Sequence, residues 1–285
     1  MYTGLFGIAV LVSAGISNTL GTSPQVLATI ALGLVSIGVL GYTYSSYASF
    51  GPGIKNNGVV FRSLTQRGVW AYASAVGLTA FYVLLYFFEG QLEGIIRGFD
   101  PLSVALSGKS ASQWFVYGVL YTLAILLFGI KFIAKYRHSR YQVIRTISVM
   151  FFQLIFAFLL PELMARLNGD LPYYDLKNMW PLNYYLFDQY AVDGFISAKS
   201  LGIGLLIFGI VSILVISPIL TYKFGKRWYC SWVCGCGGLA ETAGDAFRHL
   251  SDNSVRAWRL ERWMIHSILV LITLSTVGVV HSYLR

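Results

Sequence analysis

The chain has 285 residues, a formal net charge of +9, 56% hydrophobic residues and 12% charged residues, about half the charged fraction of soluble domains. This composition excludes a single water-soluble domain. With 16% aromatic residues and three cysteines, it also excludes a disordered chain and a disulfide-stapled secreted module. We therefore expect a multi-pass membrane protein in contact with lipid. In such a protein the positive charge indicates which loops face the cytoplasm, and it does not predict a nucleic-acid partner.

Seven apolar runs predict an all-α transmembrane bundle, because a bilayer core of ~30 Å needs roughly 20 mostly apolar residues per helix. In chain order the runs are 4–20, 24–44, 68–88, 113–130, 143–163, 199–220 and 263–281. The first run is the shortest, and a signal peptide is its alternative reading, although a basic n-region and a small-residue cleavage site are missing. The sequence therefore predicts one membrane domain over residues 1–285 with about seven spans, or six if residues 1–20 do not cross.

Basic residues lie mainly on one side of this predicted bundle. Most of the 21 Lys and Arg residues fall in 45–67, 131–145 and 221–262, which share a side when seven spans are counted. The positive-inside rule makes that side cytoplasmic, in a bacterial inner membrane, with the N-terminus inside and the C-terminus outside. The opposite segment 164–198 is rich in Tyr and Trp, which indicates either an interfacial aromatic belt or a docking surface for a partner subunit.

The three cysteines lie within seven residues, directly after a predicted span and inside the basic loop 221–262. They are Cys230, Cys234 and Cys236. Cys230 and Cys234 share a face if the stretch is helical, and flanking glycines allow Cys236 to turn to the same side. Such clustering is typical of metal ligation by thiolates.

Four further residues beside the cysteines are predicted to support a bound cofactor. The glycines Gly235 and Gly237 let backbone N–H groups approach thiolate sulfurs, and the cations Lys226 and Arg227 favour ionised thiols. The rest of the loop, over 239–262, is predicted to form two short amphipathic helices on the inner leaflet.

Soft thiolate ligands select an iron–sulfur cluster, zinc or cuprous copper. A structural disulfide does not suit a reducing cytoplasm, and zinc needs four ligands where only His249 offers a nearby nitrogen. The other alternative is that the three cysteines bind no metal and only pack within the loop. The iron–sulfur reading is favoured, but a cubane takes four protein ligands, so a partner chain, His249, Asp245 or a small molecule must supply the fourth.

The run from Gly225 to Ala240, GKRWYCSWVCGCGGLA, resembles the cysteine segment G-R-x-x-C-x-x-x-C-P-x-G-A of the NosR/NapH-type membrane polyferredoxins. In this resemblance Cys230 and Cys234 match the two family cysteines, Gly235 stands in place of the proline, and Cys236 is an additional thiol. The resemblance implies an inner-membrane electron-transfer subunit with a 4Fe-4S cluster. The second C-x-x-x-C-P and the ferredoxin module usual in that family are absent from this sequence.

These observations together predict a non-catalytic or quinone-linked electron-transfer subunit of an oxidoreductase complex. Its electrons would pass between a quinone or a cytoplasmic donor and a partner redox subunit, and quinone binding to this chain itself stays open. The alternatives are a copper-handling cupric reductase or transporter using the same thiols, and a structural scaffold subunit. Polar residues inside the spans are scarce, which argues against a transporter. Glu162 is read as a boundary acid.

Overall fold

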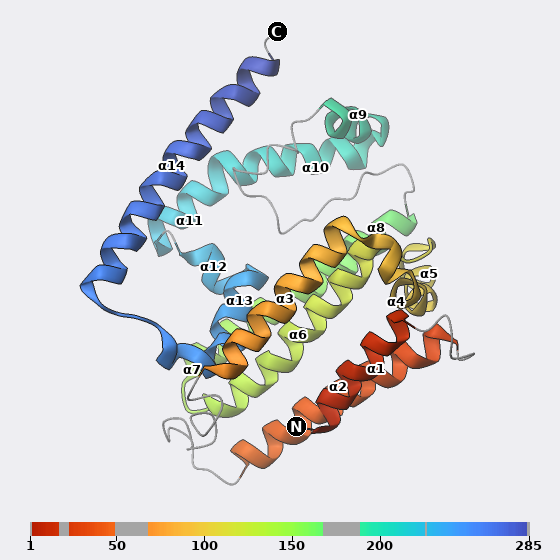
Figure 1. Ribbon diagram of the computed structural model, residues 1–285. Helices are drawn as coiled ribbons and strands as arrows, with labels where there is room; N and C mark the ends of the chain where they lie inside the picture. Colours follow the sequence, from red (N-terminus) through yellow and green to blue (C-terminus); the bar gives the residue numbers. More distant parts are fainter. Residues whose placement is uncertain (1, 17–22, 49–67, 168–188, 226, 284–285) are drawn as a thin grey trace. The chain divides into compact units, whose positions relative to one another are not determined.

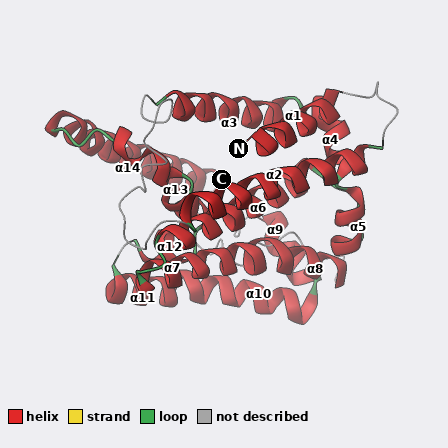
Figure 2. Cartoon of the chain, turned by 90° about the horizontal axis from the view of Figure 1, so that it is seen from below, coloured by secondary structure: helices red, strands yellow, loops and turns green. Residues whose placement is uncertain are grey.

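The computed structural model describes residues 2–16, 23–48, 68–167, 189–225 and 227–283. In these ranges all regular structure is helical and no strand occurs (Figure 2), which confirms the all-α prediction. Within the same ranges, five helical stretches are long and apolar enough to cross a membrane. They are Pro24–Tyr47, Gln113–Lys135, Arg140–Leu167, Lys199–Phe224 and Val255–Gly278.

A sixth span is counted if Tyr72–Phe87 and Gly90–Gly98, bent by 112°, are taken as one broken span. By helix length and composition the chain is a multi-pass membrane protein. The described part of the first predicted run forms α1 (Tyr2–Ile16), 15 residues long. The described residues thus contain five or six candidate spans, against the predicted seven, or six if residues 1–20 do not cross.

The N-terminal part contains α1, α2 (Pro24–Tyr47), α3 (Val69–Phe87), η1 (Glu89–Leu92), α4 (Glu93–Gly98) and α5 (Asp100–Ser107). Pro24 occupies the first turn of α2, where its missing N–H costs no hydrogen bond. Helices α1 and α2 pack closely, because a Cβ at Gly38 would lie 2.6 Å from the backbone nitrogen of Gly4.

Two antiparallel spans follow and form the support of the cysteine segment (Figure 1). One is α6 (Gln113–Lys135), and the other is the continuous series α7 (Arg140–Phe151), η2 (Phe152–Leu159) and α8 (Leu160–Leu167). The Ser112 side chain caps α6 by accepting a hydrogen bond from the backbone of Phe115 at 3.2 Å. The Phe115 and Phe158 rings join the two spans at a centroid distance of 5.7 Å. Segment η2 is a π-helix, a distortion often found at functional sites.

The next part contains α9 (Gln189–Ser197), α10 (Lys199–Val211), η4 (Ser212–Ile216), α11 (Ser217–Phe224), α12 (Trp228–Trp232), α13 (Gly235–Thr242) and η5 (Gly244–Leu250). Phe195 of α9 is buried among apolar residues of η2, α8, α10 and η4. Most of the predicted aromatic loop 164–198 falls at 168–188, outside the described residues.

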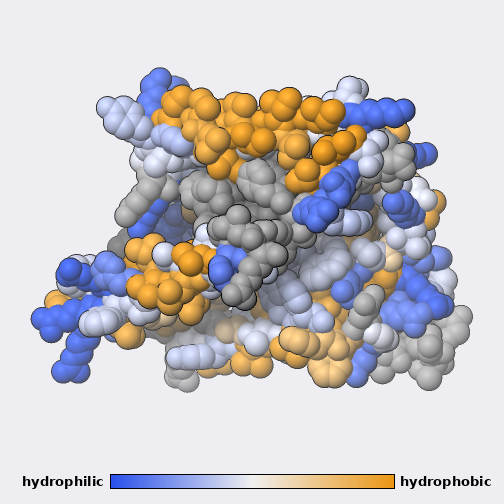
Figure 3. Space-filling model, turned by 90° about the horizontal axis from the view of Figure 1, so that it is seen from above, coloured by the Kyte–Doolittle hydropathy of each residue, from blue (hydrophilic) through white to orange (hydrophobic). Residues whose placement is uncertain are grey.

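The chain divides into two compact units, residues 1–246 and 247–285. The second unit contains α14 (Val255–Tyr283), which combines the predicted amphipathic stretch from 254 onward with the last predicted span. Its large apolar side chains are exposed, as are many in the first unit. Figure 3 shows hydrophobic residues as broad patches on the visible surface, as expected of helices that face lipid.

Candidate metal centre

The backbone of the cysteine segment turns twice within a few residues. Helix α11 ends at Phe224 and is followed by Gly225, whose φ of 83° lies in the left-handed region that glycine adopts without strain. After α12, the backbone N–H groups of Val233 and Cys234 both donate to the Tyr229 carbonyl, at 2.9 and 2.8 Å. Cys234 then takes the N-cap position of α13, and its carbonyl accepts from Gly238 at 3.0 Å.

Three glycines allow α13 to lie directly against its neighbours. An ideal Cβ would come within 1.9 Å of the Cys230 carbonyl oxygen at Gly237, and within 2.3 Å of Val149 Cγ1 at Gly238. At Gly235 it would lie 2.5 Å from Gln153 Oε1. The contact at Gly237 leaves no room for a side chain between α13 and the α12 backbone, and a side chain at Gly235 or Gly238 would require neighbouring side chains of η2, α6 or α7 to move.

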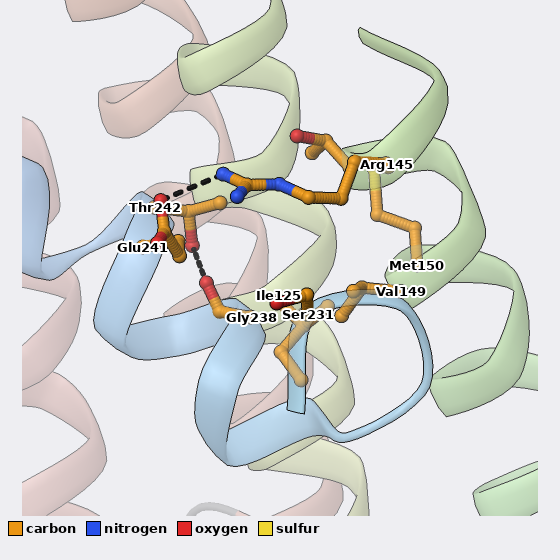
Figure 4. Close-up of a pocket in the computed structure, with 9 residues that line it drawn as sticks. Ile125, Arg145, Val149, Met150, Ser231, Gly238, Glu241 and Thr242 are labelled. Carbon is orange, nitrogen blue, oxygen red and sulfur yellow. Dashed lines mark hydrogen bonds and ion pairs between the residues drawn. The ribbon is translucent and has the colours of Figure 1, made fainter. Parts of the chain in front are cut away.

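Ion pairs hold the far end of α13 and the start of η5. Arg145 on α7 reaches Glu241 at 2.6 Å (Figure 4). Lys135 on α6 binds Asp245 at 2.5 Å, with each side chain only 5% exposed, and Tyr136 donates a hydrogen bond to the other Asp245 oxygen at 2.8 Å. If the two residues moved apart, an unpaired charge would be left buried in the protein, so this pair holds the start of η5 against α6.

The packing between α13, α6 and α7 is tight. The remaining space among Ile125, Arg145, Val149, Gly238 and their neighbours is about 10 Å³ (Figure 4), at most enough for one water molecule. Ser148 adds a hydrogen bond to the Trp232 carbonyl at 2.8 Å. The segment that carries the thiols is therefore fixed to the two supporting spans along its length.

Two of the three thiols lie together. A hydrogen bond between the thiols of Cys234 and Cys236, followed by burial, raises the pKa of the Cys234 thiol, whereas backbone N–H groups of Gly237 and Cys236 act in the opposite direction. Backbone N–H groups that face a sulfur also stabilise a metal-bound thiolate. Tyr121 on α6 donates a hydrogen bond to Cys236 Sγ at 3.3 Å.

Cys230 is exposed on α12, and all three cysteines are free thiols. Within the part of the chain that the structure describes, no group of three or more His, Cys, Asp or Glu side chains is gathered closely enough to hold a metal ion. The Cys230 backbone nevertheless lies against Gly237, so its thiol belongs to the turn next to the Cys234–Cys236 pair.

The cysteine segment folds back along the supporting spans instead of extending beyond their ends. Tyr121, the partner of Cys236, lies fourteen residues before Lys135, the last residue of α6, which corresponds to about 21 Å along the helix. It lies eight residues after Gln113, the first residue, or about 12 Å. The Cys236 sulfur is thus beside the middle part of a candidate membrane span.

A groove of about 650 Å³ adjoins the same sulfur. It runs between α6 and the series η2–α8, and its lining consists of Ser112, Trp114, Phe115, Tyr117, Gly118, Tyr121, Gln153, Ala157, Glu162 and Cys236. Cys236 lies at the end formed by Tyr121 and Gln153, and Ser112 and Glu162 lie further along the two spans.

The other predicted site residues have different environments. Lys226 lies outside the described residues, as does the side chain of His249. The Arg227 side chain is exposed, and its carbonyl accepts from Ser231 at 3.0 Å within α12. Asp245 uses both carboxylate oxygens in the bonds to Lys135 and Tyr136, so it does not offer the fourth ligand in this arrangement.

No sequence pattern indicates Tyr121 as a site residue or connects Gln153 with the cysteines. Tyr121 is 115 residues away from Cys236 in the sequence, and nothing in its own surroundings marks it. The available signal was the run of glycines from Gly235 to Gly238, because several glycines on one short helix indicate a close approach to another helix.

The three cysteines have the donor atoms that an iron–sulfur cluster needs, but a cubane takes four ligands and this segment offers three. Three thiols are the soft ligands that such clusters use, and the N–H groups beside Cys234 suit a bound thiolate. Ligation by all three requires the Cys230 side chain to turn toward the other two. A fourth donor must come from outside the Cys230–Cys236 segment.

Comparison with known proteins gives an independent indication. Residues 205–253 match the family model of a 4Fe-4S binding domain, and this stretch encloses all three cysteines. No curated protein and no solved structure shows a significant match to the chain. The chain thus combines a 4Fe-4S binding domain with several candidate membrane spans.

Proposed function

We propose that this protein is an electron-transfer subunit of a membrane redox complex, with one 4Fe-4S cluster held by Cys230, Cys234 and Cys236. The observation that carries the proposal is the match of residues 205–253 to a 4Fe-4S binding domain around these thiols, in a chain whose helices are suited to a membrane. The cluster supplies reversible one-electron storage, and the protein supplies its position, electrostatics and protection from water.

The residues of this chain have distinct parts in that role. Helix α13 presents backbone N–H groups to the Cys234 sulfur, and the Tyr121 hydroxyl donates to the Cys236 sulfur. Both kinds of hydrogen bond stabilise negative charge on the ligands and so raise the reduction potential of a bound cluster. The ion pairs at Glu241 and Asp245 keep the helix in place.

The electron partners are other molecules in this proposal, and the fourth ligand comes from outside the Cys230–Cys236 segment. A neighbouring redox or membrane subunit, a small molecule or His249, whose side chain lies outside the described residues, completes the coordination, since Asp245 is already bound to two groups. The electron donor is a quinone or a cytoplasmic protein, and the acceptor is a partner redox subunit. The likeness of GKRWYCSWVC to the NosR/NapH-type polyferredoxins supports this role.

The distribution of Lys and Arg supports a bacterial inner-membrane location with the loop 221–262 entering from the cytoplasmic side. In that orientation the cysteine segment reaches from the cytoplasmic end of α6 to the middle of the membrane. The basic side of the protein then faces the anionic inner leaflet.

The proposal is tested by purifying the protein without oxygen and measuring iron, acid-labile sulfide, copper and zinc, together with optical and EPR spectra. We expect iron and sulfide in the wild-type protein, both lost in Cys234→Ser and both kept in the control Ser231→Ala. Copper without sulfide would instead establish a copper-handling protein. Absence of every metal would refute the proposal and leave the scaffold alternative.

A further inference from the structure

The first turns of α14 carry a group of basic and aromatic side chains that the proposed function does not use. This group, called the basic face below, consists of Trp258, Arg259, Arg262, Trp263 and His266, and it lines a space of about 480 Å³. The volume lies within the range of roughly 300–1,000 Å³ that is usual for ligand sites. All five residues are exposed, so a molecule outside the chain can reach them.

The charges of the basic face lie on one side of the helix. Arg259, Arg262 and His266 are spaced by three and four residues, which makes them neighbours on the helix surface. The Arg262 guanidinium lies 5.7 Å from the centroid of the Trp258 ring, an attractive contact that holds the cation in place. Glu261, the single acidic residue of α14, is two residues from Arg259 and so lies about 160° away around the helix. No carboxylate of α14 therefore neutralises this face.

The stability of the helix does not account for these charges. The amino-terminal end of a helix is partially positive, so cations in its first turns are unfavourable, and arginines three residues apart repel each other. Arg256, Arg259 and Arg262 nevertheless fall in the first turns of α14, and its first turn has no acidic residue. A bound anion would remove this repulsion, because a guanidinium donates two parallel hydrogen bonds to one oxyanion.

The arginines of the basic face stand just before the part of α14 that is suited to the hydrocarbon core. From Trp263 to Tyr283 the helix contains no Asp, Glu, Lys or Arg (Figure 1). This stretch is about 30 Å long, which equals the thickness of the hydrocarbon core. Arg259 lies four residues before Trp263, or about 6 Å, so Arg259 and Arg262 stand at the depth of the lipid phosphates.

The same side of α14 becomes apolar beyond the basic face. Leu269 and Val270 follow His266 by three and four residues, so they continue its side of the helix, and both are exposed. An acyl chain can lie along these two residues while its phosphate meets the arginines. Inorganic phosphate or an acidic peptide would use the charges alone, so the combination favours an anionic amphiphile.

We infer that the basic face of α14 binds one anionic phospholipid, with the phosphodiester held by Arg259 and Arg262 and an acyl chain along Leu269 and Val270. The inference goes beyond the proposed electron transfer and does not depend on the iron–sulfur cluster. It is also more specific than a general attraction of basic loops to an anionic leaflet, because it assigns a single lipid to one face of one helix.

The test uses the full chain, delipidated in detergent, with dioleoylphosphatidylglycerol as the probe. Native mass spectrometry counts the bound lipids, and dioleoylphosphatidylcholine, whose headgroup has no net charge, serves as the comparison. We expect one saturable adduct, with about tenfold or more higher affinity for the anionic lipid. Equal affinity for the two lipids would overturn the inference. Full displacement by excess glycerophosphoglycerol, the headgroup without acyl chains, would also overturn it.

Two variants that remove the same charge separate a site from diffuse attraction. Arg259→Gln removes a donor to the phosphodiester and is expected to weaken binding by about tenfold or more. Arg140→Gln removes an exposed arginine at the first residue of α7, outside the basic face, and should change the affinity by less than about twofold. Equal losses in the two variants would show that only the overall charge matters and would refute the site.

The outcome is separable from the question of the iron–sulfur cluster. The basic face contains none of the three cysteines, so Cys234→Ser, which is expected to lose iron and sulfide, should still bind the lipid within about threefold of the wild type. A protein that binds one lipid without iron would support this site and refute the cluster. A protein with iron and sulfide but no saturable lipid adduct would do the reverse.

Discussion

The closest contact in the cysteine segment gives a sharp test of the site geometry. A Cβ at Gly237 would lie 1.9 Å from the Cys230 carbonyl oxygen, whereas ordinary contacts begin at 3.4 Å. In Gly237→Ala the backbones of α12 and α13 must therefore separate by about 1.5 Å. Overpacking of this kind costs about 1–3 kcal/mol, partly offset by the roughly 0.5–1 kcal/mol by which alanine favours a helix over glycine.

The separation of the α12 and α13 backbones is expected to reduce cluster binding more than it reduces the stability of the fold. Metal–ligand distances tolerate only about ±0.2 Å, so a shift of about 1.5 Å between the backbones that carry Cys230 and Cys234 prevents both from binding one cluster. We expect Gly237→Ala to fold, with a small loss in the free energy of unfolding, and to hold less than about half of the wild-type iron and sulfide. The assays are metal and sulfide analysis, EPR, and denaturant unfolding in detergent.

The matched control is Gly244→Ala in the same segment, where the nearest heavy atom to an added Cβ is the Leu239 carbonyl oxygen at 3.9 Å. This variant should keep both stability and cluster content. Full iron and sulfide in Gly237→Ala, with unchanged stability, would refute the close packing of the Cys230 backbone on α13 and with it the argument from geometry.

Three further variants probe the contacts around the segment. Gly238→Ala should destabilise the protein by roughly 1–3 kcal/mol, because its Cβ would meet Val149 Cγ1 at 2.3 Å, and the added substitution Val149→Ala should restore most of that loss. Lys135→Met leaves the buried Asp245 carboxylate without its cation and should cost about 3–5 kcal/mol in denaturant unfolding. Tyr121→Phe removes the hydrogen bond to sulfur and should lower the reduction potential in an EPR-monitored redox titration.

Each variant has a control in the same chain. Val149→Ala alone separates the loss of its own packing from the rescue of Gly238→Ala. The Glu93–Arg97 pair is 60% and 66% exposed, so Arg97→Met should cost no more than about 1 kcal/mol. Tyr82→Phe removes a phenol that bonds Tyr117 at 3.0 Å and should leave the potential unchanged. Equal effects in variant and control would contradict the assigned contacts.

The helices were predictable because their signal is local. Apolar runs set most of the expected spans within a few residues, as where the run predicted over 113–130 forms α6 with its end extended to Lys135. The run predicted from 263, by contrast, belongs to a helix that already begins at Val255. The run at 4–20 was less certain from the sequence, and its described part, α1, is not among the candidate spans. A membrane span is recognised by the length and hydrophobicity of an apolar run, and both can be read directly from one sequence.

The site was predictable only in part, because its contacts join distant parts of the chain. The spacing of the cysteines alone predicted a metal-binding segment. In contrast, the Lys135–Asp245 pair joins residues 110 apart, and the contact of Gly235 with Gln153 joins η2 to α13. Charge pairing of this kind depends on the tertiary arrangement, and the glycines from Gly235 to Gly238 indicate a close helix approach without identifying the helix that is approached.

The glycine at position 235 shows how this docking explains the sequence itself. Gly235 is the first residue of α13, a position where proline is favoured because its missing N–H costs nothing, and the polyferredoxin pattern that this segment resembles has proline there. In this chain, however, an added Cβ would lie 2.5 Å from Gln153 Oε1 and 2.8 Å from the Tyr121 ring. A proline at this position would therefore require the Gln153 and Tyr121 side chains to move. Because Tyr121 donates to Cys236 Sγ, a residue larger than glycine at 235 would displace the side chain that bonds this thiol.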